Sequence, residues 1–487
     1  MKNQIVRLSV ALAGVLLAGG CMSTKERLNR YSQAVSLGQY GRAEQIAAEK
    51  ENDGDDGLCW KLHKGSALVL QTKFSEATAT LDVAEEGFLD IDRTAALKRG
   101  YDRSISVLSN DRFLPYSGTG QERIFCSLYK GLAYASLGNH DGARVELNRA
   151  NEWQNTYLAD RQREITNYEE QLAGEANGRK AARKDEIAST LLRSPELGQS
   201  LQTSCGYMHD VSLNQGDVLA SLAKADYYNT YAQHIRGVFR WLNGDNARND
   251  LRGTFEMLPE TSCASRDFTE YEAGTKPHGQ AWIYVEDGLC PMRDQTVIHL
   301  PLGLLPWVRR YVLYTGIALP KLVYRPFASS QYSVHGSGGS FALEPIMDTD
   351  RLCKAEFDVA FRGVLQREIL RFSIKTAIQV AAGVVARNAP RSKAGDILAA
   401  SMFLVQLGTA GWTAATVGAD LRSWTALPKR VFCQRIAFTP GETVTLQADT
   451  RAIPVPMPSC ENAIVVVRYP AVSSAPSISF ITFNPQE

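Results

Sequence analysis

The pattern of small, apolar and polar positions between Tyr129 and Ala150 predicts a helical hairpin. Small and apolar residues recur at helical intervals on both sides of a Leu-Gly-Asn turn, which places them on the facing sides of two helices. Small residues in such a seam let the helix backbones approach closely, while larger residues fill the space beside them. The positions are Gly131, Tyr134, Gly138, His140, Ala143, Leu147 and Ala150.

The same spacing occurs twice more toward the N-terminus. Ala43 and Ala77 are 34 residues apart, and Ala77 and Ala143 are 66 residues apart, close to a double period. The interval resembles that of the tetratricopeptide repeat (TPR), in which stacked hairpins bury a core that one hairpin cannot bury alone. A plain helical bundle is the alternative. The two further sets are Gly65, Leu68, Thr72, Phe74, Ala77, Leu81 and Ala84, and Tyr31, Ala34, Gly38, Tyr40, Ala43, Ala47 and Lys50.

The later part of the chain changes from helical to strand patterns near Pro277. Before that point, a weaker hairpin keeps Gly237 and Gly244, but Asn249 stands where alanine is expected. Two groups of short alternating runs then flank a helical region, and they could form one sheet system with the helices inserted between them. The fold class is therefore mainly α with a β-rich C-terminal part, a TPR-like α-solenoid followed by a mixed α+β region. The expected divisions are a signal peptide at 1–20, TPR-like repeats at 21–160, further helical hairpins at 161–272, a β-rich segment at 273–345, a helical insertion at 350–427 and a C-terminal β segment at 428–487.

One run in the helical insertion, Ile397 to Gly418, is apolar enough to raise the question of a membrane span. Its glycines and threonines favour a buried core helix instead.

The first residues predict secretion and lipidation. Lys2 and Arg7 precede an apolar run that is shorter than the roughly 20 residues needed to cross a bilayer, so a cleaved signal peptide fits better than a transmembrane helix. Small residues then stand directly before Cys21, as in the bacterial lipobox, in which this cysteine is acylated. Met22 rather than aspartate follows, and the resemblance to lipoproteins of diderm bacteria implies an anchor in the outer membrane, on its periplasmic face.

The net charge limits the classes of molecule that the protein is expected to bind. Without the signal peptide the chain has 51 basic and 52 acidic residues, a net charge of −1, so no general field attracts nucleic acid or anionic lipid. The expected partners are the membrane, through the N-terminal lipid, and a protein or peptide of the cell envelope.

Eight cysteines remain beside the lipidated Cys21, and an oxidising compartment permits disulfides among them. Cys433 and Cys460 flank the central part of the C-terminal β segment, and we hypothesise that they are bridged; two separate buried thiols are the alternative. The spacing shows no CxxC and no Cys/His ligand cluster, so neither a metal site nor another cofactor is predicted.

Enzymatic motifs are mostly incomplete. Gly274 to Gly279 has the spacing of a phosphate loop, but Gln280 and Ala281 replace the lysine and hydroxyl residue that such a loop needs. Asp420, Arg422 and Trp424 could be catalytic, yet a buried ion pair capped by an aromatic side chain is the favoured interpretation. No catalytic residue is assigned.

Several separated motifs resemble a family of poorly characterised bacterial lipoproteins with TPR-like repeats. They are PYSGTGQERIF, GARVELNRANE, WIYVEDGLCP, HLPL, IALPKL, REILRFSIK, ADLRSWTALP and TPGE. The family pattern has arginine at two neighbouring positions where this chain has Asn148 and Arg149. Genes of similar proteins often lie beside those for lipoprotein activators of peptidoglycan synthases, so the resemblance implies a role in the cell envelope.

Two functions of different classes remain. The first is a TPR-type interaction scaffold in the envelope, without enzymatic activity. The second is an enzyme acting on peptidoglycan or another glycan through acidic residues such as Glu286 and Asp287. We favour the scaffold, because neighbouring residues on a strand point to opposite faces, which does not suit a shared acid and base.

The scaffold hypothesis predicts where a partner binds. In a TPR hairpin the first helix lines the concave face, and the residues that point into this groove are mostly apolar. Either an external peptide or a later segment of the same chain could fill such a groove. The predicted groove residues are Ser32, Val35, Leu62, Ser66, Val69, Leu128, Leu132 and Ala135.

Overall fold

The structure is a computed structural model that describes most of the chain after the lipobox. The described residues are 23–98, 114–176, 227–299, 316–361, 396–405, 418–449 and 451–484, with a few further positions between 364 and 392. The predicted signal peptide and Cys21 lie outside them.

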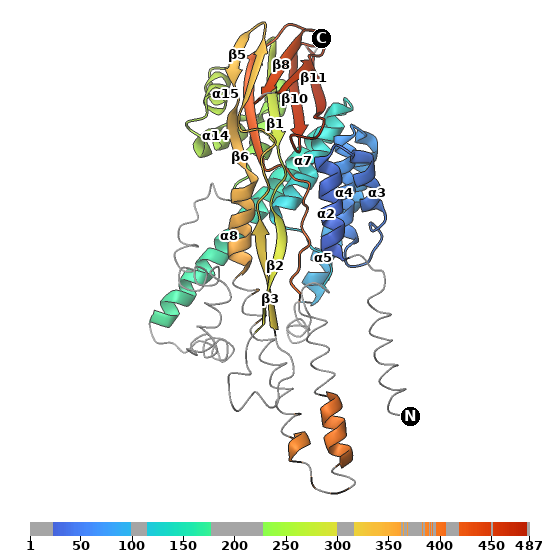
Figure 1. The fold of residues 1–487 in the computed structure, drawn as a ribbon. Coiled ribbons are helices and arrows are strands. Elements are labelled where there is room, and N and C mark those ends of the chain that lie inside the picture. The colour runs from blue at the N-terminus through green and yellow to red at the C-terminus, as the bar shows by residue number, and fades with distance from the viewer. Residues whose placement is uncertain are drawn as a thin grey trace.

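Helices dominate the first half of the described chain, and they pack in sequence order. Each helix contacts the next from α2 to α5, α5 contacts α7, and α8 contacts α13, so the hairpins form an elongated stack (Figure 1). The helices are α2 (Thr24–Ser36), α3 (Tyr40–Ala48), α4 (Gly57–Leu70), α5 (Phe74–Lys98), α7 (Gly120–Ser136), α8 (His140–Ala176), α13 (Thr230–Leu242), α14 (Arg248–Met257) and α15 (Ser262–Glu272). The predicted hairpins are confirmed as helix pairs, while their assignment to the TPR family stays a prediction.

Glycine and leucine meet in the seam of three hairpins. A Cβ atom added to Gly65 would lie 2.4 Å from Leu81 Cδ2, and one added to Gly131 would lie 2.9 Å from Leu147 Cγ. A Cβ atom added to Gly237 would likewise lie 2.9 Å from Cδ2 of Leu251 in the following helix. A Cβ atom at any of these glycines would overlap the facing leucine, so the leucine or the helix would have to move.

The weaker hairpin of α13 and α14 corrects one detail of the sequence prediction. Ala247, not Asn249, is the fully buried small residue after the turn, and Asn249 is exposed. The residues of α14 that face α13 therefore begin two positions earlier than the repeat spacing predicts.

The strands form two packed sheets and a separate two-stranded ribbon. A five-stranded sheet has the order β11-β10-β1-β7-β6, a four-stranded sheet has the order β5-β4-β8-β9, and β2 pairs with β3. The strands are β1 (Gln280–Asp287), β2 (Met292–His299), β3 (Gly316–Val323), β4 (Tyr332–Gly336), β5 (Gly339–Ala342), β6 (Glu344–Asp348), β7 (Arg430–Ala437), β8 (Thr443–Ala448), β9 (Arg451–Pro456), β10 (Asn462–Tyr469) and β11 (Ser477–Phe483). β1 pairs with β10 in parallel and with β7 antiparallel, so the two β stretches of the sequence do share one sheet.

The five-stranded sheet is the middle of three layers. Along β1, Trp282 and Tyr284 belong to the hydrophobic core shared with the helices, whereas Ile283 and Val285 belong to the core shared with the four-stranded sheet. This alternation follows from the two-residue period of a strand. A sheet buried on both faces explains the nearly continuous apolar sequence of β10, whose residues are all buried. The prediction of a mainly α protein with a β-rich C-terminal part is confirmed.

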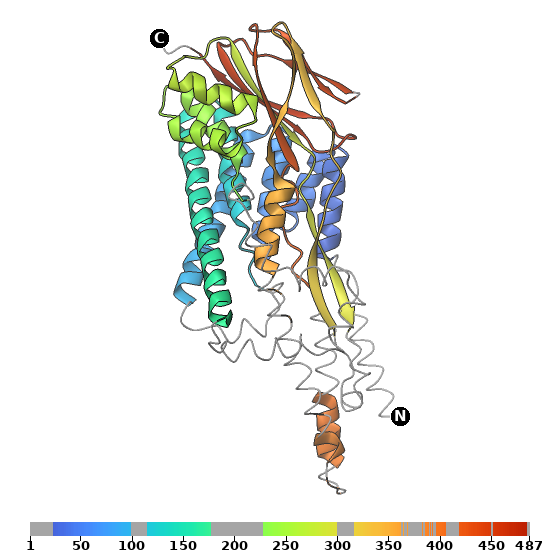
Figure 2. The ribbon, with the colours of Figure 1, turned by 90° about the vertical axis from the view of Figure 1, so that its left-hand side faces the viewer.

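The sheets lie at one end of the molecule and the β2–β3 ribbon runs toward the other (Figure 2). Helical residues 396–405 lie beyond that other end, away from the body (Figures 1 and 2). For the described part of the run, up to Val405, the prediction of a buried core helix is wrong, because Ile397 is 71% exposed and Leu404 is 66% exposed. Residues 406–417 of the run lie outside the described residues. An apolar sequence indicates that the helix packs against another apolar surface. It does not tell whether that surface belongs to the same chain or to another molecule. Among the described residues, no helix has both the length and the hydropathy needed to cross a membrane.

Candidate functional site

The predicted partner groove is closed in the structure. Val35 and Leu62 have no exposed surface, and Val69 alone of the eight predicted residues is half-buried rather than buried. The buried residues are Ser32, Val35, Leu62, Ser66, Leu128, Leu132 and Ala135. The hypothesis of an open binding surface is therefore wrong for these residues, and the alternative of a groove filled by the same chain describes them.

A non-helical segment just before β7 fills the N-terminal part of the groove. We call residues 419–428 the strap. Trp424 of the strap is fully buried, and its Nε1–H donates a hydrogen bond to Ser66 Oγ at 2.8 Å. The hydroxyl of Thr425 lies 3.2 Å from that of Ser32. The strap thus occupies the position that an external peptide would take in the scaffold hypothesis.

Glu122 connects the strap to the first turn of α7. Thr119 and Glu122 form a capping box, in which the carboxylate accepts a hydrogen bond from Thr119 N at 2.9 Å. The other carboxylate oxygen accepts from Trp424 N at 2.6 Å, and Tyr116 also donates to this side chain at 2.5 Å. One side chain therefore fixes both the start of α7 and the backbone of the strap.

His63 of α4 holds the next residue of the strap. Its Nδ1 lies 2.7 Å from Cys59 O, and its Nε2 lies 3.0 Å from the Thr425 hydroxyl and 3.2 Å from Thr425 N. Nδ1 must donate to the carbonyl, so the neutral ring leaves Nε2 free to accept from Thr425. Burial lowers the pKa of His63 to about 4, which favours this neutral form.

The ion pair predicted at Asp420 and Arg422 is present. Arg422 is buried, and its guanidinium donates to Asp420 at 2.8 Å and to Asp56 at 3.1 Å. It also donates to the carbonyl of Asp55 at 3.1 Å. The arginine therefore joins the strap to the turn before α4.

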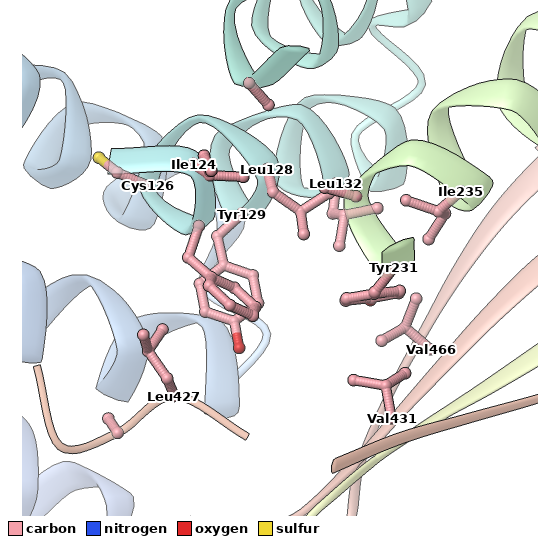
Figure 3. Close-up of a cluster of buried hydrophobic side chains, with 14 of the residues drawn as sticks. Ile124, Cys126, Leu128, Tyr129, Leu132, Tyr231, Ile235, Leu427, Val431 and Val466 are labelled. Atoms are coloured by element: carbon pink, nitrogen blue, oxygen red, sulfur yellow. The ribbon is translucent and has the colours of Figure 1, made fainter. Parts of the chain in front are cut away.

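In the C-terminal part of the groove, the sheet and α13 replace the strap as packing partners. Leu128 and Leu132 of α7 point toward Tyr231 and Ile235 of α13 (Figure 3). Val431 and Val466 of the five-stranded sheet lie beneath Tyr231 in the same cluster (Figure 3). This part of the groove is interdomain core.

The two acidic residues of the enzyme hypothesis point to opposite faces of β1. Glu286 faces the helices and accepts hydrogen bonds from Tyr129 and Tyr231, both at 3.0 Å, while Arg468 lies 3.3 Å away. Burial raises the pKa of Glu286.

Asp287 faces the other way. It accepts hydrogen bonds from Ala328 N and Ser329 N at 3.0 Å and from Tyr332 at 2.7 Å. Both carboxylates are buried and bound by protein groups, so they do not form a paired acid and base.

A second buried cluster surrounds Lys130. Its ammonium lies 2.6 to 3.0 Å from the carboxylates of Asp82, Glu85 and Glu146. Arg149 pairs with Glu85 and Glu146, at 2.7 and 2.8 Å. The three carboxylates are close enough together to suggest a cation site, but the lysine already lies among them. Asn148, which stands where the family pattern has arginine, accepts a hydrogen bond from Arg236 at 2.9 Å.

The predicted bridge between Cys433 and Cys460 is wrong. Cys433 belongs to the core on the helical face of the five-stranded sheet, whereas Cys460 belongs to the core between the two sheets. Both are free, and the sheet separates them. Cys433 Sγ instead lies 3.6 Å from the Sγ of Cys263, which is grouped with His234 and Asp267.

Two cavities lie on either side of the strap. The first, of about 510 Å³, has Tyr116, Arg293 and Phe357 in its wall, and the second, of about 550 Å³, has Lys25, Asp56 and Trp60. Asp420 and Arg422 contribute to both. Ser23, two residues after Cys21 in the sequence, also lines the second cavity.

Comparisons with known proteins add no identification: no family profile matches the chain, and neither a curated protein nor a solved structure matches it significantly.

Proposed function

We propose that the protein is a lipoprotein anchored through Cys21 in the outer membrane, where it faces the periplasm and acts as an interaction scaffold of the cell envelope. The N-terminal sequence supports the anchor. The lipoprotein resemblance supports an envelope role, with the machinery of peptidoglycan synthesis as the class of partner. A mechanism with Glu286 and Asp287 as catalytic groups has less support, because both carboxylates are enclosed by protein.

One observation carries the scaffold proposal: helical residues 396–405 expose five large apolar side chains. These are Ile397, Leu398, Phe403, Leu404 and Val405. Apolar patches of this kind mark surfaces that bind a protein or a membrane. We assign partner binding to this helix, which we call the apolar helix, and not to the filled groove.

Removal of the lipid anchor is the first test. Cys21→Ser is expected to release the protein from the membrane fraction or leave its signal peptide uncleaved, since acyl chains contribute ~0.8 kcal/mol of membrane affinity per buried CH₂. Membrane fractionation and mass spectrometry of the N-terminus measure both outcomes. Met22→Leu, one residue away, should leave fractionation and acylation unchanged. An acyl-free N-terminus in the wild-type protein would contradict the proposal.

Charge reversal of the apolar surface is the second test. Ile397→Asp with Leu404→Asp is expected to abolish cross-linking to an envelope protein in intact cells, because two carboxylates would have to be desolvated in the interface. The melting temperature should change little, since exposed substitutions usually change stability by about 0.5 kcal/mol or less.

The matched control places aspartate at two other exposed apolar positions. Leu137 is 49% exposed and Val145 is 53% exposed, and the variant Leu137→Asp with Val145→Asp should retain the cross-linked product. Equal cross-linking by all three proteins would exclude the apolar helix as the binding surface. Loss of binding to lipid vesicles by the Ile397/Leu404 variant, without any protein cross-link in the wild type, would assign the helix to the membrane.

A further inference from the structure

Four potential metal ligands meet on the helical face of the five-stranded sheet. His234 comes from α13, Cys263 and Asp267 come from consecutive turns of α15, and Cys433 comes from β7. All four side chains are buried. We call these residues the His-Cys-Asp-Cys cluster.

Three distances within the cluster are close to those of ligands around one small ion. Cys263 Sγ lies 3.6 Å from Cys433 Sγ and 3.8 Å from Asp267 Oδ2. His234 Nε2 lies 3.1 Å from Asp267 Oδ2. The ligand atoms of His234, Cys263 and Asp267 all lie within 4.8 Å of one another.

We propose that the His-Cys-Asp-Cys cluster is a structural zinc site. Zinc bonds of about 2.3 Å to sulfur and about 2.0–2.2 Å to nitrogen or oxygen place tetrahedral ligand atoms about 3.3–3.8 Å apart. The three distances above agree with these values to within a few tenths of an ångström. His234, Cys263 and Asp267 are therefore placed to hold an ion, and Cys433, whose Sγ lies 3.6 Å from Cys263 Sγ, would turn toward it as the fourth ligand. A Cys263–Cys433 disulfide would need a closer approach, since bonded sulfurs lie about 2.05 Å apart.

Neighbouring groups hold two of the ligands in place. The hydroxyl of Tyr284 lies 2.8 Å from His234 Nδ1, the nitrogen opposite the one that faces Asp267. Trp282 Nε1–H donates to Asp267 Oδ2 at 2.7 Å. Hydrogen bonds of this kind set the ring orientation of a metal-bound histidine and the position of a metal-bound carboxylate.

The local charge also suits a divalent cation. Two thiolates and one carboxylate would leave a net charge of −1 around Zn²⁺, and the guanidinium of Arg435 lies 3.0 Å from Asp267 Oδ1. Binding would displace the protons of Cys263 and Cys433 into solvent, with no redox change.

With Cys433 as the fourth ligand, all four ligands come from the protein and are buried. Such a site has no open position for a substrate, so its role is structural. The ion would join α13 and α15 to β7, and would keep the two thiols reduced in an oxidising compartment.

The test measures metal and thiols in the same protein. The chain from residue 22 onward, purified without added zinc, is expected to contain one zinc ion per chain by mass spectrometry of the elements. After zinc is removed with a chelator, titration with zinc should restore one ion per chain, and cobalt should give a thiolate-to-cobalt charge-transfer absorption band. Cys263→Ser with Cys433→Ser should lower the zinc content to background.

Cys460→Ser is the matched control, because Cys460 is also a buried free cysteine but lies on the other face of the sheet. It should retain the full zinc content. The proposal is overturned if the wild-type chain has free thiols at Cys263 and Cys433 yet takes up no zinc, or if the chain isolated from an oxidising compartment has a Cys263–Cys433 disulfide. Both of these outcomes are measured on the wild-type protein alone. The test therefore stays decisive even if the serine variant misfolds.

Discussion

Leu132→Asp is expected to lower the free energy of unfolding by about 3–5 kcal/mol, the usual cost of a buried charge without a partner. Leu132 is only 8% exposed and packs within the core shared by the helices and the sheet. If the predicted groove were open, Leu132 would be exposed, and the same substitution would hardly change the free energy of unfolding. Urea unfolding followed by circular dichroism measures the difference.

The control uses a leucine at the end of the same helix. Leu137 follows the last residue of α7 and is 49% exposed, so Leu137→Asp should change the free energy of unfolding by about 0.5 kcal/mol or less. Equal stability of the two variants would show that α13 and the sheet do not cover this part of the groove in solution, and would restore it as a binding surface.

The helical hairpins were predictable because their signal is local. The spacing of Gly131 and Leu147 reflects one close contact between neighbouring helices, and the same contact recurs at Gly65 and Leu81. Each pair lies within a short stretch of sequence, where the helical period fixes which residues face each other. The ion pair of Asp420 and Arg422 was predictable for the same reason.

No local sequence pattern predicted that the strap fills the groove. Trp424 and Ser66 are separated by 358 residues, and the strap is an irregular segment without a period of its own. The apolar character of the groove is the same whether a partner or the strap covers it. Sequence patterns therefore identified the groove residues and left their occupant open.

The prediction of a Cys433–Cys460 disulfide failed for a related reason. A strand pattern tells which residues alternate, but it does not tell which face of a sheet will receive the helices. Cys433 and Cys460 consequently looked like a pair in sequence although opposite cores contain them. Within the His-Cys-Asp-Cys cluster, the single local sign is the four-residue spacing of Cys263 and Asp267 on α15, which is common in helices without a metal.

The stability of the strap should depend on pH through His63. The ordinary pKa of a histidine is about 6.5, and burial lowers that of His63 to about 4 in the folded protein. Between these values the unfolded chain binds a proton at this residue and the folded chain does not. The stability that the neutral ring provides is therefore complete above about pH 6.5 and is lost as the pH falls toward 4.

The shift corresponds to about 3 kcal/mol, at 1.36 kcal/mol for each pKa unit. We expect this amount to appear as a change, between pH 7 and pH 4, in the difference between the unfolding free energies of the wild type and His63→Gln. Carboxylates titrate in both proteins, so their contributions cancel in that difference. His278 is exposed and pairs with Glu461, so His278→Gln is the control for removal of a surface histidine. A wild-type to His63→Gln difference that does not vary with pH would contradict a neutral, buried His63, and with it the hydrogen bonds that hold Thr425 of the strap against α4.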